Sequence, residues 1–252
     1  MRRIPLSDLR EALRLGVHDF GAGFSHYIFA ALICPLIGLC LFALTARMSA
    51  WHLIYPFTAG FALVGPFVSL GLYEFSRRRE LGLDTAPRKI FAVLGSPALP
   101  AIAALGLWLA VLFLGWLLFA QMLYGRVFSG LVFDGPAEFL SAVFGTERGW
   151  VLLLYGNLAV LVFAFIVLGT TVVSFPLLLD RDVGVIAAVS VSALALIKNP
   201  GPVLAWGAIV AGLLMIGALP VLIGLIVVLP VLGHATWHLY RKLVWFEEPD
   251  QT

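Results

Sequence analysis

Charged side chains are scarce in this chain, and their scarcity excludes most classes of soluble protein. Only 12% of the 252 residues are Asp, Glu, Lys or Arg, whereas 62% are hydrophobic. A soluble domain has about a quarter of its residues charged. The apolar residues gather in stretches of about 20, the length that crosses a hydrocarbon core of about 30 Å. The composition predicts an all-α fold, a polytopic membrane helix bundle.

Cysteine is almost absent, which excludes a disulfide framework. Cys34 and Cys40 are the two in the chain and lie in one apolar segment. Their spacing forms no CxxC motif and points the two thiols in different directions. We expect two small buried side chains rather than a redox pair.

The apolar stretches predict six membrane spans in a single domain, residues 26–242. The 38 residues from 203 to 240 carry almost no charge, and one helix of that length would measure about 57 Å, too long for a single crossing. A break around residues 217–221 divides them into two spans joined by a tight turn. The other predicted spans are residues 26–46, 52–75, 99–122 and 150–175.

The basic residues predict which side of the membrane each loop occupies. With six spans, one side holds thirteen of the 16 Lys and Arg residues and the other holds three. Because cytoplasmic loops carry an excess of Lys and Arg, both termini should be cytoplasmic. The three residues expected on the opposite side are Arg47, Arg126 and Arg148.

Three segments lie outside the predicted spans. Residues 1–25 are amphipathic, with a helix over residues 6–18 that suits the membrane surface rather than a cleaved signal peptide. Residues 183–198 are apolar but short, as in an interfacial or re-entrant helix, and the prolines of NPGP end them. The sequence leaves open whether residues 126–148 form a cap or dip back into the membrane. Residues 243–252 are expected to form a cytoplasmic tail.

Catalytic signatures are missing too. The chain has no catalytic triad, phosphate-binding glycine loop or CxxC site, and no ionisable residue is expected deep within a span. Buried charges mark ion-coupled transport and proton relays, so we expect neither an enzyme nor a proton-coupled carrier. Asn157 is the one strongly polar residue well inside a span. It is expected to bond a neighbouring helix, with a ligand contact as the alternative.

The most charged stretch predicts the main candidate site. In YEFSRRRE, residues 73–80, Glu74 can pair with Arg77 or Arg78 at helical spacing, while Arg79 follows directly. Such a cluster at the cytoplasmic edge anchors a span and can hold anionic lipid headgroups or a phosphate-bearing ligand. The turn Asp180–Arg181–Asp182 is the second charged candidate on this face.

Two histidines, His234 and His238, lie one helical turn apart near the end of the last span. With His26 they are candidates for a haem or metal site. HATWH lacks the glutamate of a HExxH zinc hydrolase. The other interpretation is that they are interfacial side chains beside Trp237 and Tyr240, which look like an aromatic belt at the headgroup level.

Four motifs carry a family resemblance: GPFVSLGLYEFSRRRE, SFPLLLDRDVG, NPGPVLAW and GLIVVLPVLGHATWHLYRKLV. In their order and wording the chain resembles a bacterial family of predicted integral membrane proteins classed as a domain of unknown function, from about Gly16 to Val244. The resemblance implies a cytoplasmic-membrane protein without an activity to carry over. Some members are labelled as similar to cytochrome c oxidase subunit I. That subunit buries its histidine ligands within its spans, whereas the histidines here are expected near span ends.

The function predicted from these features is non-enzymatic. We expect a membrane-embedded binding or accessory protein, or a passive permeability component, that contacts anionic lipids and a membrane-protein partner or a second copy of itself, but no nucleic acid. No cofactor is expected. The alternative is a redox-associated subunit that holds haem, a metal or a quinone through the cytoplasmic-side histidines. A secondary transporter is the third hypothesis.

Overall fold

The structure, a computed structural model, describes the backbone of residues 1–48, 50–220 and 222–245. Within those ranges, the side chains of residues 24–35, 59–64, 67, 68, 87, 90 and 91 lie outside the described part. The described backbone is helical and contains no strand, which confirms the all-α prediction. Its elements are α1 (Ser7–Arg47), η1 (Trp51–Leu53), α2 (Ile54–Glu80), η2 (Pro87–Gly95), α3 (Leu99–Val127), α4 (Pro136–Gly145), α5 (Glu147–Thr171), α6 (Ser174–Asp180), α7 (Val185–Lys198), α8 (Pro200–Ala218) and α9 (Leu225–Leu243).

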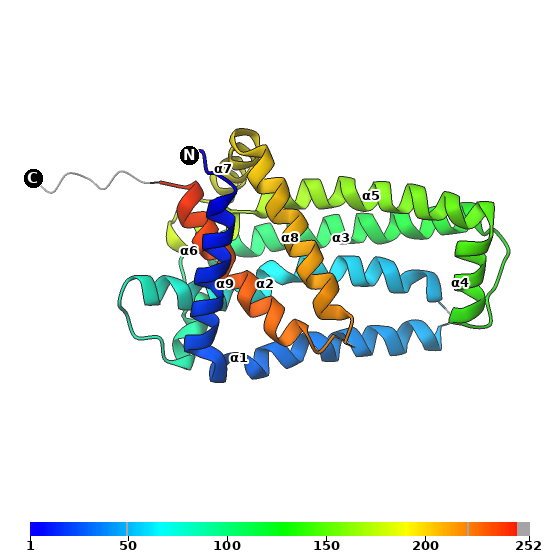
Figure 1. The fold of residues 1–252 in the computed structure, drawn as a ribbon, viewed down its shortest axis with the longest axis horizontal. Helices are drawn as coiled ribbons and strands as arrows, with labels where there is room; N and C mark the ends of the chain where they lie inside the picture. The colour runs from blue at the N-terminus through cyan, green and yellow to red at the C-terminus, as the bar shows by residue number, and fades with distance from the viewer. Residues whose placement is uncertain (49, 221, 246–252) are drawn as a thin grey trace, which may run out of the picture.

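The long helices form an elongated bundle. Helices α2, α3 and α5 run along the long axis of the molecule, with α3 packed between the other two (Figure 1). Among the described residues, three stretches are long and apolar enough to cross a membrane: Leu99–Val127, Glu147–Asp180 and Pro200–Ala218. Helices α1 and α2, of 41 and 27 residues, also exceed the length of one crossing. Each contains positions whose side chains are not described.

Helix α1 joins two segments that the sequence predicted as separate. The expected surface helix over residues 6–18 and the expected span over residues 26–46 form one continuous helix. In Figure 1 this helix changes direction: its first part lies across one end of the bundle and the rest follows the long axis. Helix α1 packs extensively against α9.

In the last third of the chain, the helices begin and end close to the predicted breaks. Helix α7 covers the predicted short segment, and Asn199 alone separates it from α8. Helices α8 and α9 form a hairpin whose turn falls where the sequence predicted a break. A Cβ on Gly224 would lie 2.7 Å from the carbonyl oxygen of Gly217, so the turn depends on close backbone approach. Helix α9, predicted as the sixth span, is not among the three apolar stretches because its second half carries polar and basic side chains.

The two ends of the bundle differ in composition. The C-terminal turns of α2 and α9 meet at the end near the N-terminus, and we call this the arginine-rich end (Figure 1). Helix α4 lies across the opposite end, which we call the aromatic end. Helix α4 lies within the connection of residues 126–148, packs on α5 and caps this end of the bundle.

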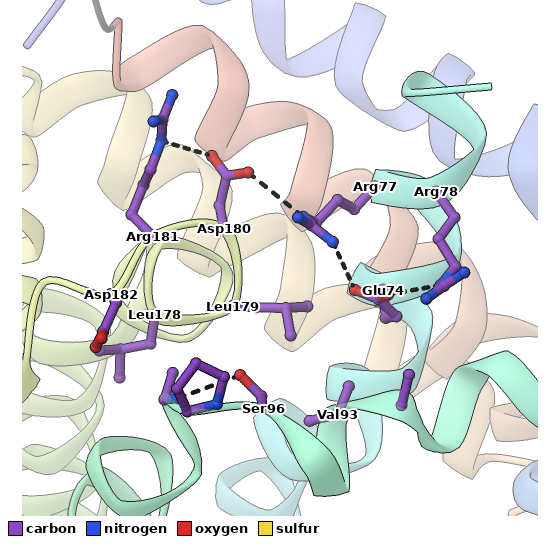
Figure 2. A pocket seen from close by; sticks show the side chains of 13 residues that line it. Glu74, Arg77, Arg78, Val93, Ser96, Leu178, Leu179, Asp180, Arg181 and Asp182 are labelled. Atoms are coloured by element: carbon purple, nitrogen blue, oxygen red, sulfur yellow. Dashed lines mark hydrogen bonds and ion pairs between the residues drawn. The ribbon is translucent and has the colours of Figure 1, made fainter. Parts of the chain in front are cut away.

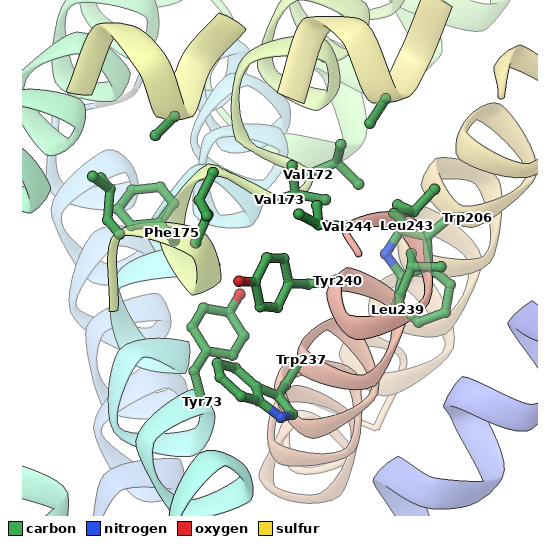
Figure 3. Close-up of a cluster of buried hydrophobic side chains, with 14 of the residues drawn as sticks. Tyr73, Val172, Val173, Phe175, Trp206, Trp237, Leu239, Tyr240, Leu243 and Val244 are labelled. Carbon is green, nitrogen blue, oxygen red and sulfur yellow. The ribbon is translucent and has the colours of Figure 1, made fainter. Parts of the chain in front are cut away.

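The core lies toward the arginine-rich end and is built around α9 (Figure 3). Trp237 and Tyr240 are 1% and 0% exposed. The expectation that they form an aromatic belt at the membrane surface was therefore wrong, because α1, α2 and α6 all pack against α9. The expectation of a buried Cys40 was also wrong, since this side chain is exposed on α1.

Candidate binding site at the arginine-rich end

Charged residues from two distant parts of the chain line one cavity at the arginine-rich end (Figure 2). This charged cavity, of about 340 Å³, lies between the last turns of α2, the helix η2 and the link that follows α6. Both charged clusters that the sequence singled out contribute to it. Its ionisable wall consists of Glu74, Arg77, Arg78, Asp180, Arg181 and Asp182.

Glu74 is the most buried ionisable residue of this wall, at 4% exposed. Arg78 Nε donates to its Oε1 at 2.6 Å, and Arg77 Nη1 donates to its Oε2 at 3.3 Å. The predicted pairing at helical spacing is thus present with both arginines. Because a buried carboxylate is stable only when it is paired and hydrogen bonded, Glu74 fixes the positions of the two guanidinium groups.

Arg77 also connects α2 to α6. Its Nε lies 3.6 Å from Oδ1 of Asp180, an ion pair that is too long for a hydrogen bond. This Nε is buried, and no described atom accepts a hydrogen bond from it. A buried donor without an acceptor costs about 1–3 kcal/mol. An oxygen atom supplied by a ligand in the cavity would remove that cost.

Asp180 links the charged cavity to α9. Its Oδ2 accepts a hydrogen bond of 2.7 Å from the Tyr240 hydroxyl and lies 3.5 Å from Arg241 Nη1. Arg241 Nε donates in turn to Glu80 at 2.9 Å, and the Trp237 indole donates to the same carboxylate at 3.0 Å. The network therefore joins α2, α6 and α9. Sequence reasoning missed the roles of Glu80 and Tyr240, since their partners are far away along the chain.

Arg79, the third arginine of the predicted cluster, does not line the cavity. Its Nη1 donates to Asp19 Oδ1 at 2.8 Å and to the His18 carbonyl at 3.2 Å, both on α1. The three neighbouring arginines thus serve two sites, because successive residues of a helix point in different directions.

Asp19 stands at the centre of a buried polar cluster that joins α1, α2 and α9. Its Oδ2 accepts a hydrogen bond of 2.6 Å from Ser76 Oγ and lies 2.8 Å from His238 Nε2. Ser76 Oγ in turn lies 2.8 Å from His234 Nδ1. We call Asp19, Ser76, His234 and His238 the buried polar cluster. Sequence reasoning missed Asp19 and Ser76, and no spacing motif marks either residue.

The surroundings of Asp19 act on its ionisation in opposite directions. Burial disfavours the carboxylate, whereas hydrogen bonds from His238 and Ser76 favour it. The hydrogen bonds prevail, so the pKa of Asp19 lies below its ordinary value of 3.8. The carboxylate is therefore charged at neutral pH and holds the cationic Arg79 in place.

The histidines occupy different surroundings from those predicted. His234 is fully buried, so the interpretation of an interfacial side chain was wrong for it. His238 is partly buried against Asp19. The side chain of His26 lies outside the described part of the structure. Among the described residues no group of three or more His, Cys, Asp or Glu side chains is placed to hold a metal ion, and the haem or metal site stays a prediction.

Asn157 lies far from these residues, toward the aromatic end. Its Oδ1 accepts a hydrogen bond of 2.9 Å from the Tyr55 hydroxyl of α2, and its Nδ2 donates to the Leu153 carbonyl at 2.8 Å. The expected bond to a neighbouring helix is confirmed.

Comparison with known proteins identifies the family of this chain but assigns it no activity. No curated protein and no solved structure matches the chain. A family of predicted integral membrane proteins matches residues 54–180, which include every residue of the charged cavity except Arg181 and Asp182. The match covers half of the chain and confirms the resemblance within that range. The chain belongs to the family described as predicted integral membrane protein (DUF2189), whose function is unknown.

Proposed function

We propose that the protein is a non-enzymatic binding protein of a bacterial cytoplasmic membrane, and that its charged cavity receives the phosphate of an anionic lipid headgroup. The proposal includes six spans with both termini on the cytoplasmic side. It also places the arginine-rich end at the cytoplasmic surface, where anionic headgroups attract basic residues.

The distribution of basic residues supports this orientation. Arg47 ends α1, Arg126 lies in the last turn of α3 and Arg148 lies in the first turn of α5. These helix ends meet at the aromatic end (Figure 1). The arginine-rich end carries the basic last turns of α2 and α9. A membrane protein keeps such an excess on its cytoplasmic side.

One observation carries the binding proposal: Arg77 lines the charged cavity, and its buried Nε has no hydrogen-bond acceptor among the described residues. A phosphate oxygen is the acceptor that a guanidinium group pairs with most strongly, by charge-assisted hydrogen bonds. The ion pairs with Glu74 and Asp180 hold this group in place before a ligand arrives. The cavity volume is near the lower limit of small-molecule sites, which suits a headgroup rather than a whole lipid.

The experiment is native mass spectrometry of the detergent-purified protein mixed with phosphatidylglycerol or phosphatidylcholine. We expect saturable retention of phosphatidylglycerol by the wild type and its loss in Arg77→Gln. Arg88→Gln is the matched control, because Arg88 is exposed on η2 and does not line the cavity. Equal retention by the two variants, or equal retention of both lipids by the wild type, would contradict the proposal.

The proposed topology has its own test. A cysteine introduced at Arg88 should react with a membrane-impermeant maleimide only after the cells are opened, whereas one introduced at Val132, exposed next to α4, should react in cells whose outer membrane is permeable. The reverse labelling pattern would mean that the arginine-rich end faces away from the cytoplasm and would contradict the proposed topology.

A further inference from the structure

A second cavity, of about 220 Å³, lies at the aromatic end and belongs to no site described above. Its walls come from η1 and the first turn of α2, from α3, from the cap α4 and from α5. Most of the lining is aromatic or aliphatic, including Trp116, Tyr124, Phe139 and Phe144. We call it the aromatic cavity.

The ring contacts around this cavity give it a defined shape. His52 stacks on Tyr124 with ring centroids 3.8 Å apart and an interplanar angle of 5°. His52 Nε2 also lies 2.8 Å from Gln121 Oε1, which fixes the plane of the imidazole. The Trp116 indole donates to the Pro56 carbonyl at 3.0 Å and packs edge-on against Phe163. The walls are therefore held in place without a ligand.

Besides His52 and Tyr124, two further side chains with polar groups interrupt this apolar lining. Tyr55 and Asn157 bond each other across α2 and α5, and both line the cavity. Asn157 Nδ2 donates one hydrogen bond, to the Leu153 carbonyl, and its second amide hydrogen is paired with no described residue. The Asn157 side chain is exposed on α5. Asn157 is seven residues beyond Trp150, about 10 Å along the helix at 1.5 Å per residue. An unpaired amide hydrogen at that depth in hydrocarbon is costly, so a bound acceptor is favoured.

We propose that the aromatic cavity binds a planar ring that carries a carbonyl oxygen, the chemistry of a quinone headgroup. The aromatic walls contact the faces and edges of the ring. The free hydrogen of Asn157 donates to the carbonyl oxygen, and the Tyr55 hydroxyl keeps the amide oriented. The volume exceeds the roughly 150 Å³ that holds benzene in an engineered protein cavity. A ring with two or three substituents therefore fits, while its tail lies in the membrane.

A lipid acyl chain is the competing occupant, and the polar pair argues against it. An acyl chain accepts no hydrogen bond, so it leaves the amide of Asn157 unpaired. Tyr55 is 50% exposed, and Phe144 and Leu140 on α4 are exposed beside it. The cavity is therefore open to the lipid, and a membrane-soluble quinone reaches it without crossing water.

The test uses menadione, a quinone without a tail, and protein in phosphatidylcholine nanodiscs. Since Trp116 lines the cavity, binding is measured as saturable quenching of tryptophan fluorescence. Gly156 lines the cavity. A leucine side chain at this position would fill it, since an added Cβ has room and meets only Leu123 at 3.9 Å. Its matched control is Gly212→Leu, where a Cβ meets nothing within 4 Å. We expect wild-type affinity in the control and a loss of at least about tenfold in Gly156→Leu, because the added side chain occupies the space of the ring.

A second variant and a second ligand test the hydrogen bond itself. Asn157→Leu removes the amide and should weaken menadione about fivefold, the loss expected for one hydrogen bond. In the wild type, 2-methylnaphthalene, which has the ring without the carbonyls, should displace menadione about fivefold less well than menadione itself. The Asn157→Leu variant and the 2-methylnaphthalene competition also test the proposal if Gly156→Leu fails to fold.

Three outcomes would overturn the proposal. Linear quenching of equal slope in all variants would mean that menadione only dissolves in the membrane. Equal competition by 2-methylnaphthalene would mean that the carbonyl is not recognised. Displacement of menadione by dodecane as strongly as by menadione itself would assign the cavity to acyl chains. None of these results bears on the charged cavity, which lies at the other end of the bundle.

Discussion

The two ends of this bundle are held together by different forces. At the arginine-rich end, α1, α2, α6 and α9 are joined by ion pairs and by hydrogen bonds among buried polar side chains. At the aromatic end, ring contacts join α3 to α4 and to α5. Two hydrogen bonds between side chains add η1 and α2 to this group. Paired charges are sensitive to the removal of one partner, whereas each aromatic ring contact contributes only about 0.5–1.5 kcal/mol. The comparison predicts that single polar substitutions matter far more at the first end.

The largest effect is expected for Asp19→Ala. This change removes the acceptor of Ser76, His238 and Arg79 and leaves a partly buried guanidinium without its carboxylate. Breaking a buried pair by removing one partner costs about 3–5 kcal/mol, and the partial exposure of Arg79 reduces that figure here. We expect a large drop of the Tm in detergent, measured by the change in tryptophan fluorescence on heating.

Glu11→Ala is the matched control for this variant. Glu11 is an acidic residue of the same helix, and its exposed carboxylate pairs with Arg14. An exposed pair contributes little, so the Tm should stay near that of the wild type. If the two variants lost the same stability, burial of the ion pair at Asp19 would not be what stabilises this end.

A close helix contact should give the next largest effect. A Cβ on Gly16 would lie 2.7 Å from the backbone nitrogen of Ala235 and from the carbonyl oxygen of Val231. Backbone atoms of α9 cannot move aside, so Gly16→Ala should separate α1 from α9 and cost about 1–3 kcal/mol. Gly21→Ala, where a Cβ meets nothing within 4 Å, should be neutral or slightly stabilising. Thermal unfolding of both variants in one detergent decides the point, and a neutral Gly16→Ala would refute the close packing.

At the aromatic end we expect a smaller loss. Trp116→Phe keeps an aromatic ring against Phe163 but removes the hydrogen bond to the Pro56 carbonyl. The expected cost is about 1 kcal/mol, the net value of one hydrogen bond. Chemical unfolding followed by circular dichroism at 222 nm measures it. A loss as large as that of Asp19→Ala would erase the contrast between the two ends.

The smallest effect is a pH dependence confined to the arginine-rich end. Because the pKa of Asp19 lies below its ordinary value of 3.8, the ionised carboxylate stabilises the fold above that pH. This contribution is lost as the pH falls through the lowered pKa of the folded state. The Tm of the wild type should therefore approach that of Asp19→Asn as the pH falls from about 5 to below 3.8. A difference between their Tm values that stays constant over this range would contradict the assigned partners of Asp19.

The sequence predicted the helical class, the breaks before α8 and between α8 and α9, and the clustering of charged candidates. These features are local, since they depend on apolar length, on prolines and on charges within one or two turns. The position of the break between α8 and α9 followed from the maximum length of one crossing.

The buried polar cluster was not predictable in the same way. Asp19, Ser76 and His234 meet because α1 changes direction and lies across α9, and no local pattern encodes that bend. For the same reason Trp237 and Tyr240 were expected at the surface. Their residue types and their place near the end of a predicted span are typical of an interfacial belt, and the contacts of α9 with α1, α2 and α6 bury them. Contacts between residues far apart in the sequence thus determine which of these side chains are buried, and composition alone does not predict those contacts.

The most direct test of the central proposal is an electron cryomicroscopy structure of the protein in nanodiscs that contain phosphatidylglycerol. A fiducial antibody fragment bound at the aromatic end would make a chain of 252 residues tractable. The account predicts density for a lipid phosphate in the charged cavity, within hydrogen-bonding distance of Arg77 Nε. A cavity that contains no headgroup, with Arg77 Nε bonded to Asp180 or another protein oxygen, would contradict it.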